Sequence, residues 1–198
     1  MSNGDQINPR RRLGAILFAD IADYSRLMEQ DEIGTWQAVR ERIEAFNERA
    51  ESYGGRVLQI RGDGLFLLFD SAVDAVGFAV EAQKRMKALN QDLAHDRQLW
   101  FRIGINLGEV LLGAQDASGD SVNIAARIEA LARPGDVCIT AAVYEQVRNK
   151  LSFGYSYLGP QTLKNISEPV DTFQVHEDPS AGLMATGYRR RALRGPTA

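Results

Sequence analysis

The chain has 198 residues, of which 44% are hydrophobic and 25% are charged, as expected for one soluble globular domain with a sizeable core. A net charge of −3 argues against a surface that binds nucleic acid or anionic membrane, because such surfaces need an excess of Lys and Arg. Cys138 is the only cysteine, which excludes an intrachain disulfide and a thiolate metal cluster and predicts a cytoplasmic location. No apolar run approaches the roughly 20 residues of a membrane span.

The two ends of the chain lack sustained hydrophobic periodicity. Residues 1–12 and 178–198 are therefore expected to be flexible tails on either side of one folded domain, residues 13–177.

Hydrophobic periodicity predicts an alternation of strands and helices between these tails. Gly62-Asp63-Gly64 separates two short apolar runs and indicates a hairpin turn. The predicted elements are a strand at Leu13–Ile21, a helix at about Asp31–Tyr53, strands at Arg56–Arg61 and Leu65–Phe69, a helix at about Ala72–Leu89, a strand at Trp100–Leu112, a helix at about Ser121–Ala132, a strand at Asp136–Thr140, a short helix near Ala141–Arg148 and a terminal pair of strands. This order predicts an α+β fold with a ferredoxin-like β-α-β-β-α-β core, extra C-terminal α/β elements and helices on one face of the sheet.

Two aspartates occupy positions that suit a metal site. Asp20 lies near the end of an apolar strand, where a carboxylate is costly to bury without a partner such as a cation. Asp63 lies in the glycine-flanked turn, and two carboxylates on neighbouring strands hold hard divalent ions through oxygen. Either residue alone is more often a cap or a turn former.

Two further segments suit phosphate chemistry. Ala22-Asp23-Tyr24-Ser25 leads into a helix whose first N–H groups are placed to cradle a triphosphate. Asn123 and Arg127 stand four residues apart and share one face of a predicted helix, where an amide and a guanidinium suit phosphoryl transfer. The ordinary alternative is a solvated Asn and an Arg that pairs with Glu129 or Asp120.

Several ordered motifs together resemble the class III adenylate/guanylate cyclases, over about Arg12 to Val175. Motifs that recur in this order are far more specific than any one of them alone. They are Phe18-Ala19-Asp20-Ile21, Gly62-Asp63-Gly64, Arg102-Ile103-Gly104-Ile105-Asn106-Leu107-Gly108-Glu109-Val110, Gly119-Asp120-Ser121-Val122-Asn123-Ile124-Ala125-Ala126-Arg127, and Leu163-Lys164-Asn165-Ile166 before Pro169.

The resemblance implies a nucleotidyl cyclase that works as a head-to-tail homodimer with two Mg²⁺ or Mn²⁺ ions in each active site. It implies that the metal aspartates come from one protomer, and the ribose-binding Asn and the transition-state Arg from the other. Carried over by position, the metal residues are Asp20, Ile21 and Asp63, the catalytic residues are Asn123 and Arg127, and the triphosphate-binding residues are Ala22, Asp23, Tyr24, Ser25 and Lys164.

The expected base-binding residues depart from the pattern of the family's adenylate cyclases. Where those enzymes have a lysine and an aspartate, this chain has Gln59 and Asp116. Gln59 still donates an N–H to adenine N1 while Asp116 accepts from the exocyclic amine, so ATP is the expected substrate. Arg61 lies two residues from Gln59 on the same strand face, where its bulk favours a pyrimidine, as in bacterial antiphage cyclases that make cyclic UMP or cyclic CMP. GTP fits less well, because guanylate-type sites usually pair an acidic residue with a small one.

Two alternatives belong to other functional classes. A catalytically silent cyclase homologue that binds nucleotide or a partner would usually have lost one of Asp20, Asp63, Asn123 and Arg127, and all four are present. An RNA-binding ferredoxin-like module needs aromatic residues on a central strand, and Arg56–Arg61 has none.

Overall fold

A computed structural model describes residues 10–113 and 117–182. The elements are β1 (Arg10–Ile21), α1 (Tyr24–Gln30), α2 (Glu32–Ser52), β2 (Arg56–Arg61), β3 (Gly64–Phe69), α3 (Ala72–Leu89), the 3₁₀ turn η1 (His95–Arg97), β4 (Phe101–Leu112), β5 (Ala117–Ser118), α4 (Asp120–Leu131), β6 (Val137–Thr140), α5 (Ala141–Val147), β7 (Gly154–Gln161) and β8 (Val170–His176). Within these ranges, no helix is long and apolar enough to cross a membrane.

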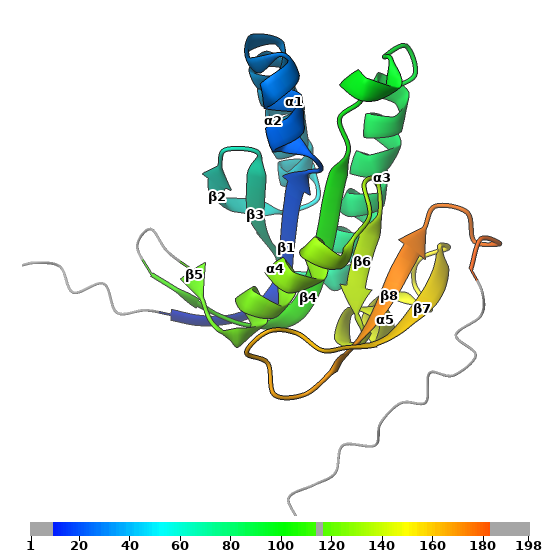
Figure 1. Ribbon diagram of the computed structural model, residues 1–198. Helices are drawn as coiled ribbons and strands as arrows, with labels where there is room; N and C mark the ends of the chain where they lie inside the picture. The colour runs from blue at the N-terminus through cyan, green and yellow to red at the C-terminus, as the bar shows by residue number, and fades with distance from the viewer. Residues whose placement is uncertain (1–9, 114–116, 183–198) are drawn as a thin grey trace, which may run out of the picture.

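The strands form one mixed sheet, in the order β2-β3-β1-β4-β6-β8-β7 with β5 paired to β4 (Figure 1). Strands β2, β3, β1 and β4 are antiparallel neighbours, and their order is that of a ferredoxin-like unit. β4 and β6 are parallel, and β8 and β7 continue the sheet antiparallel. The α+β prediction is therefore confirmed.

Strand β1 begins three residues earlier than the hydrophobic pattern predicts. Arg10, Arg11 and Arg12, which we expected in a tail, pair with Leu112, Leu111 and Val110 of β4. Polar side chains carry no hydrophobic signal, but the backbone ladder between the two 12-residue strands extends through them.

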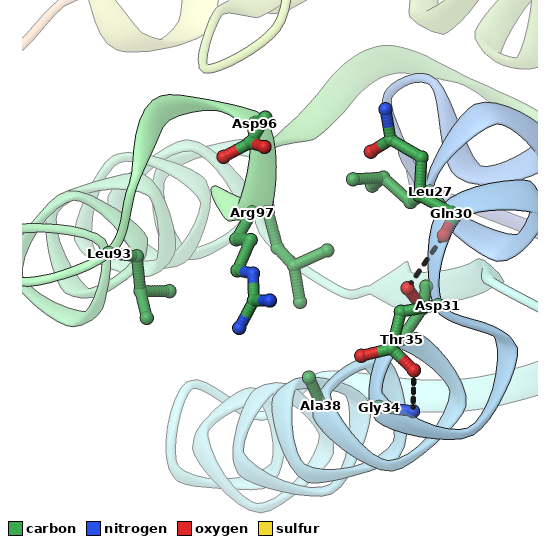
Figure 2. Close-up of a pocket in the computed structure, with 10 residues that line it drawn as sticks. Leu27, Gln30, Asp31, Gly34, Thr35, Ala38, Leu93, Asp96 and Arg97 are labelled. Atoms are coloured by element: carbon green, nitrogen blue, oxygen red, sulfur yellow. Dashed lines mark hydrogen bonds between the residues drawn. The ribbon is translucent and has the colours of Figure 1, made fainter.

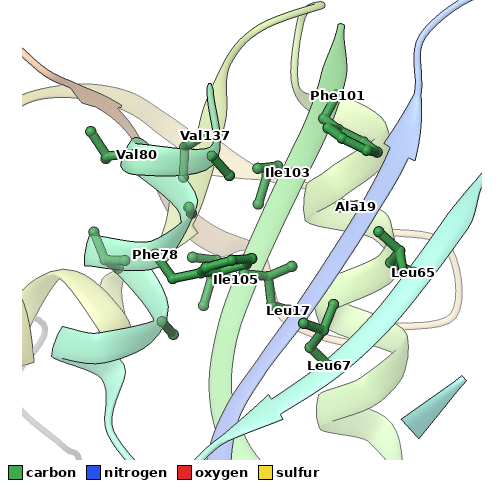
Figure 3. Close-up of a cluster of buried hydrophobic side chains, with 14 of the residues drawn as sticks. Leu17, Ala19, Leu65, Leu67, Phe78, Val80, Phe101, Ile103, Ile105 and Val137 are labelled. Carbon is green, nitrogen blue, oxygen red and sulfur yellow. The ribbon is translucent and has the colours of Figure 1, made fainter. Parts of the chain in front are cut away.

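Helices α1, α2, α3 and α5 cover one face of the sheet. Alternate residues of β1, such as Leu17 and Ala19, point to this face and pack with Phe78 of α3 and with Phe101 and Ile105 of β4 (Figure 3). These helices and strands share one large apolar core that fixes the direction of β1.

Helix α4 covers the opposite face, which corrects the expectation that the helices share one face. Val122 and Ala125 of α4 pack against Ile16, Leu68 and Val110. Because β1 and β3 are apolar on both faces, the second face also needs a cover. The side chains at the end of β1 thus point either toward the α3 core or toward α4.

Candidate active site

Strand β1 and the β2–β3 turn bring the two predicted metal aspartates together. Gly62 adopts a left-handed backbone conformation (φ 60°), which allows the two-residue turn that presents Asp63. In the antiparallel register of β1 and β3, which pairs Ala19 with Leu65, Asp63 lies at the level of Ile21, the residue after Asp20. Burial, followed by the proximity of Asp20, raises the pKa of Asp63. Asp20 therefore lies close enough to Asp63 to disfavour the charge of the Asp63 carboxylate.

Asp20 pairs with Arg102, its cross-strand neighbour on β4. Arg102 donates to both carboxylate oxygens, from Nε to Oδ1 at 3.0 Å and from Nη2 to Oδ2 at 2.7 Å. The two side chains are 28% and 31% exposed, so water screens the pair only in part. This bidentate hydrogen bond raises the pKa of Arg102 and holds Asp20 in one orientation.

Glu129 of α4 is a third carboxylate at this place. Its Oε1 lies 3.3 Å from Nε of Arg102, and its side chain is only 12% exposed. Burial and the neighbouring Asp20 raise the pKa of Glu129 to about 8. The region thus concentrates three acidic groups around a single guanidinium.

The donor set fits hard divalent cations that also bind a nucleotide. Within residues 10–113 and 117–182, no three His, Cys, Asp or Glu side chains are arranged to hold a metal ion by themselves. However, Mg²⁺ is commonly held by one or two carboxylates, with substrate phosphates and waters as its other ligands. Burial, and after it the closeness of Asp20, raises the pKa of Asp63, and a cation bound by both carboxylates relieves the repulsion between them.

Asn123 and Arg127 lie on a side of α4 that points away from Asp20 of the same chain. Helical residues two apart point about 200° from each other, so Arg127 diverges from Glu129, which faces Arg102. Asn123 is exposed, and Arg127 is half-buried, with Nη1 buried and without a hydrogen-bond partner among the described residues. The pairing of Arg127 with Glu129 that we considered is not observed, because Glu129 pairs with Arg102.

A buried polar network fixes the start of α4. Asn106 of β4 is 5% exposed and donates from Nδ2 to the carbonyl oxygen of Ser121 at 3.0 Å. Thr140, the last residue of β6, donates in turn to Oδ1 of Asn106 at 2.9 Å. The first turn of α4, which carries Asn123, is therefore anchored to two strands of the sheet.

Lys164 lies in the β7–β8 loop on the α4 side of the sheet. The loop is anchored by Leu163 and Ile166, which pack with Ile124 and Ile128 of α4. Lys164 itself is exposed. The loop that carries Lys164 therefore packs against the helix that carries Asn123 and Arg127.

Gln59 and Arg61 lie on edge strand β2, on the sheet face that carries Asp20. Gln59 pairs with Phe66, which pairs in turn with Phe18, and the two rings stack at a centroid distance of 4.5 Å. From Gln59 to Arg61 the register is regular, so these two residues share a face as predicted. Asp116, the other expected base-binding residue, lies outside the described residues.

The segment Ala22–Ser25 offers fewer free N–H groups than predicted. The N–H of Ala22 donates to the carbonyl oxygen of Trp100 at 2.8 Å, so it is not free for a phosphate. Asp23 turns the chain with a left-handed backbone (φ 57°), and α1 begins at Tyr24. The N–H groups of Asp23, Tyr24 and Ser25 make no such bond among the described residues, so they remain of the predicted cradle.

A separate pocket of about 460 Å³ lies between the start of α2 and the η1 turn (Figure 2). Arg97 points into it opposite Thr35, and Leu27 and Leu99 supply apolar lining. None of the predicted site residues lines this pocket.

Sequence reasoning assigned no role to Arg102 and considered Glu129 only as a partner of Arg127. A signal for Glu129 was present, because it lies one turn after Ala125 on the apolar face of α4. The pairing of Arg102 with Asp20 was not visible, since it depends on the register between β1 and β4.

The fold and the site together define a class of protein. A family model described as "Adenylate and Guanylate cyclase catalytic domain" matches residues 10–177, and the chain belongs to this family. The match begins where β1 begins and ends one residue after β8.

Individual relatives agree with this membership. The chain is 43% identical over 168 residues to "Putative adenylate cyclase 3" of Rhizobium meliloti (strain 1021), a match that covers 81% of this chain and 28% of that protein. It is 31% identical over 145 residues to "Adenylate cyclase" of Streptomyces coelicolor, which covers 69% of this chain and 34% of that protein. The chain thus spans about a third of the length of these relatives, or less.

Solved structures match the fold over nearly their whole length. An adenylate/guanylate cyclase/hydrolase from Silicibacter pomeroyi superposes with a TM-score of 0.77 at 37% identity, covering 85% of this chain and 99% of that one. The adenylyl cyclase CyaB from P. aeruginosa superposes with a TM-score of 0.78 at 24% identity, covering 87% and 97%. At that lower identity, the CyaB likeness concerns the fold alone.

Proposed function

We propose that this chain is an active nucleotidyl cyclase that converts ATP to 3′,5′-cyclic AMP and pyrophosphate. The observation that carries the proposal is the convergence of Asp20 and Asp63 where β1 ends beside the β2–β3 turn. The full set of Asp20, Asp63, Asn123 and Arg127 in a member of the cyclase family supports activity over a silent homologue.

Asp20 and Asp63, with the main chain of Ile21, would hold two Mg²⁺ or Mn²⁺ ions. When bound, such ions would lower the pKa of the ribose 3′-hydroxyl and neutralise negative charge on the triphosphate. Asn123 orients the ribose so that its 3′-oxygen faces the α-phosphorus, and this orientation contributes several kcal/mol to the barrier reduction. Arg127 donates to the phosphate oxygens on which charge develops, and Lys164, Tyr24 and Ser25 bind the β- and γ-phosphates.

The active site is shared between two protomers of a head-to-tail homodimer. Within one chain, α4 directs Glu129 toward Asp20 while Asn123 and Arg127 point elsewhere. The unpartnered, buried Nη1 of Arg127 supports this arrangement, since a buried guanidinium nitrogen without an acceptor is costly unless a ligand supplies one. A two-fold dimer then has two equivalent composite sites.

Adenine is the base that Gln59 and Asp116 suit best. The Gln59 amide donates to N1 and Asp116 accepts from the exocyclic amine. A pyrimidine cyclase, making cyclic UMP or cyclic CMP in antiphage defence, is the second candidate. It is favoured by Arg61, which lies on the same face of β2 as Gln59.

The test is to incubate the purified protein separately with ATP, GTP, CTP and UTP, with Mg²⁺ and with Mn²⁺, and to identify the products by mass spectrometry. We expect cyclic AMP and pyrophosphate from the wild type, and no product from Asp63→Ala. Asp70→Ala is a matched control, because Asp70 is an exposed partner of Arg12 outside the site and its loss has little effect on stability. Absence of a cyclic product from every triphosphate with both metals would favour the silent homologue.

A further inference from the structure

Arg102 hydrogen-bonds both carboxylate oxygens of Asp20, which the proposed reaction requires as a metal ligand. It donates to Oδ1 and Oδ2 of Asp20 at 3.0 and 2.7 Å. This fork-to-fork contact fills the directions in which a carboxylate prefers to bind a cation. Arg102 and a divalent ion are therefore alternative partners of Asp20.

Glu129 provides a second acceptor for the same guanidinium. Its Oε1 lies 3.3 Å from Nε of Arg102, yet that buried oxygen accepts no hydrogen bond among the described residues. A guanidinium that leaves Asp20 thus finds the acidic side chain of Glu129 beside it and need not become buried without a partner. The Glu129 oxygen in turn gains the hydrogen bond that it lacks.

We propose that Arg102 is a positioning residue that competes with a divalent cation for Asp20 and transfers to Glu129 when the cation binds. This inference rests on the proposed function, because it takes Asp20 as a metal ligand. In the resting protein, Arg102 holds Asp20 in place and offsets the charge of the neighbouring carboxylates. In the protein with the cation bound, Arg102 of β4 pairs with Glu129 of α4. Glu129 lies two residues after Arg127 on the same helix.

Charge alone gives a competing explanation, since any cation beside Asp20 weakens metal binding. Arg102→Lys separates the two explanations, because lysine keeps the charge but has no planar fork to hold both oxygens of Asp20. Competition by the fork predicts tighter metal binding in Arg102→Lys, whereas charge alone predicts no change. Arg11→Lys is the matched control, because Arg11 makes a single exposed contact with Glu109 on the same pair of strands.

The measurement is the dissociation constant of Mn²⁺ for the full chain without nucleotide, obtained from the electron paramagnetic resonance signal of free Mn²⁺. We expect Arg102→Lys to lower this constant roughly three- to tenfold, the range for a partly exposed charge-assisted pair. Glu129→Gln should raise it, because a single neutral amide oxygen is a weaker acceptor for the Arg102 guanidinium than a carboxylate. Thermal unfolding followed by circular dichroism verifies that each variant is folded.

The double variant Arg102→Lys/Glu129→Gln tests the transfer itself. If Glu129 acts by receiving the Arg102 fork, the effect of Glu129→Gln shrinks at least severalfold once residue 102 is lysine. Additive effects of the two substitutions would show that both residues act by charge alone, and would overturn the proposal. An unchanged Mn²⁺ constant in Arg102→Lys would overturn it as well.

Asp20→Asn distinguishes failure of this inference from failure of the proposed function. If Asp20→Asn binds Mn²⁺ as the wild type does, Asp20 is not a metal ligand and both proposals fall. If Asp20→Asn weakens binding while Arg102→Lys has no effect, the metal site stands and only the competition by Arg102 is wrong.

Discussion

Gly104 of β4 lies directly beneath Glu129 of α4. A Cβ atom built on Gly104 would stand 2.5 Å from the Cα of Glu129 and 2.7 Å from the carbonyl oxygen of Ala125. Both are backbone atoms, which cannot rotate away as a side chain can. The absence of a side chain at Gly104 therefore allows α4 to approach the sheet closely, and this close approach places Glu129 beside Arg102.

Gly104→Ala should destabilise the protein and reduce its cyclase activity. The added methyl group must push α4 outward, an overpacking cost of about 1–3 kcal/mol. We expect a lower midpoint of thermal unfolding. We also expect a lower kcat in the variant that still folds, because Asn123 and Arg127 are residues of α4 and shift with it. Calorimetry and product formation measure the two effects.

Gly77→Ala is the matched control for this substitution. Gly77 lies inside α3, and a Cβ there would meet only the ring atom Cε1 of Tyr53, at 3.4 Å. Since alanine is the better helix former by up to about 1 kcal/mol, Gly77→Ala should leave stability equal or slightly higher. If Gly104→Ala is equally harmless, α4 is not held at the distance that the structure describes.

The sequence predicted the elements well because their signals are local. The helix at Ala72–Leu89 and the hairpin around Gly62 follow from spacing and turn chemistry, and both are confirmed. The side of the sheet taken by α4 was wrongly predicted, since an amphipathic helix does not encode which face of a two-sided apolar sheet it covers. The Asp20–Arg102 pair was missed because it joins residues 82 positions apart.

Mixing two inactive variants should restore activity if the site is shared between protomers. Asp63→Ala lacks one side of the site and Arg127→Ala lacks the other, so a heterodimer of the two contains one intact site. Random mixing makes about half of the dimers heterodimers, each with one of its two sites intact, which predicts up to about a quarter of the wild-type rate. The measurement is cyclic nucleotide formation after co-refolding or co-expression.

The control mixes Asp63→Ala with Asp20→Ala. In the proposed dimer, one protomer supplies both of these residues to each site. No heterodimer of this pair regains an intact site, so the mixture should stay inactive. Co-purification of differently tagged chains shows whether heterodimers form. If the Asp63→Ala and Arg127→Ala heterodimers form but the mixture stays inactive, the site is not shared between protomers.

Cys138 should resist alkylation in the folded protein. Burial raises the pKa of its thiol to about 12, and the thiolate is the reactive form. We expect iodoacetamide at pH 8 to label the urea-unfolded chain within minutes and the native chain orders of magnitude more slowly, as measured by intact mass. Rapid labelling of the native protein would show that the α4–β6 region opens readily.

The same shift predicts the sign of a pH effect on stability. An acid whose pKa is higher in the folded state keeps its proton there after the unfolded chain has lost it. Stability is therefore lost as the pH rises from about 9, the ordinary thiol value, toward about 12. Cys138→Ala should show a smaller alkaline loss of stability than the wild type, measured by urea unfolding between pH 8 and pH 10.

Substitutions on β2 should reveal which base the site accepts. A site built from hydrogen-bonding groups rejects a mismatched base strongly, by up to about 10⁴-fold, because a buried donor or acceptor is left unpaired. If adenine is native, Gln59→Lys keeps or raises ATP turnover by supplying a charged donor, and Arg61→Thr has a mild effect. Arg56→Thr, on the same strand but three residues before Gln59, is the control that removes an exposed arginine outside the base region.

The opposite pattern would identify a pyrimidine cyclase. In that case the wild type turns over UTP or CTP in preference to ATP, and Arg61→Thr erodes the preference by opening the space that the guanidinium fills. The measurement is kcat/KM for the four triphosphates in wild type, Gln59→Lys, Arg61→Thr and Arg56→Thr. Production of cyclic UMP or cyclic CMP with ATP left unchanged would overturn adenine as the base. It would leave the cyclase assignment intact, because in the proposed mechanism Asp20, Asp63 and Arg127 act on the phosphates and not on the base.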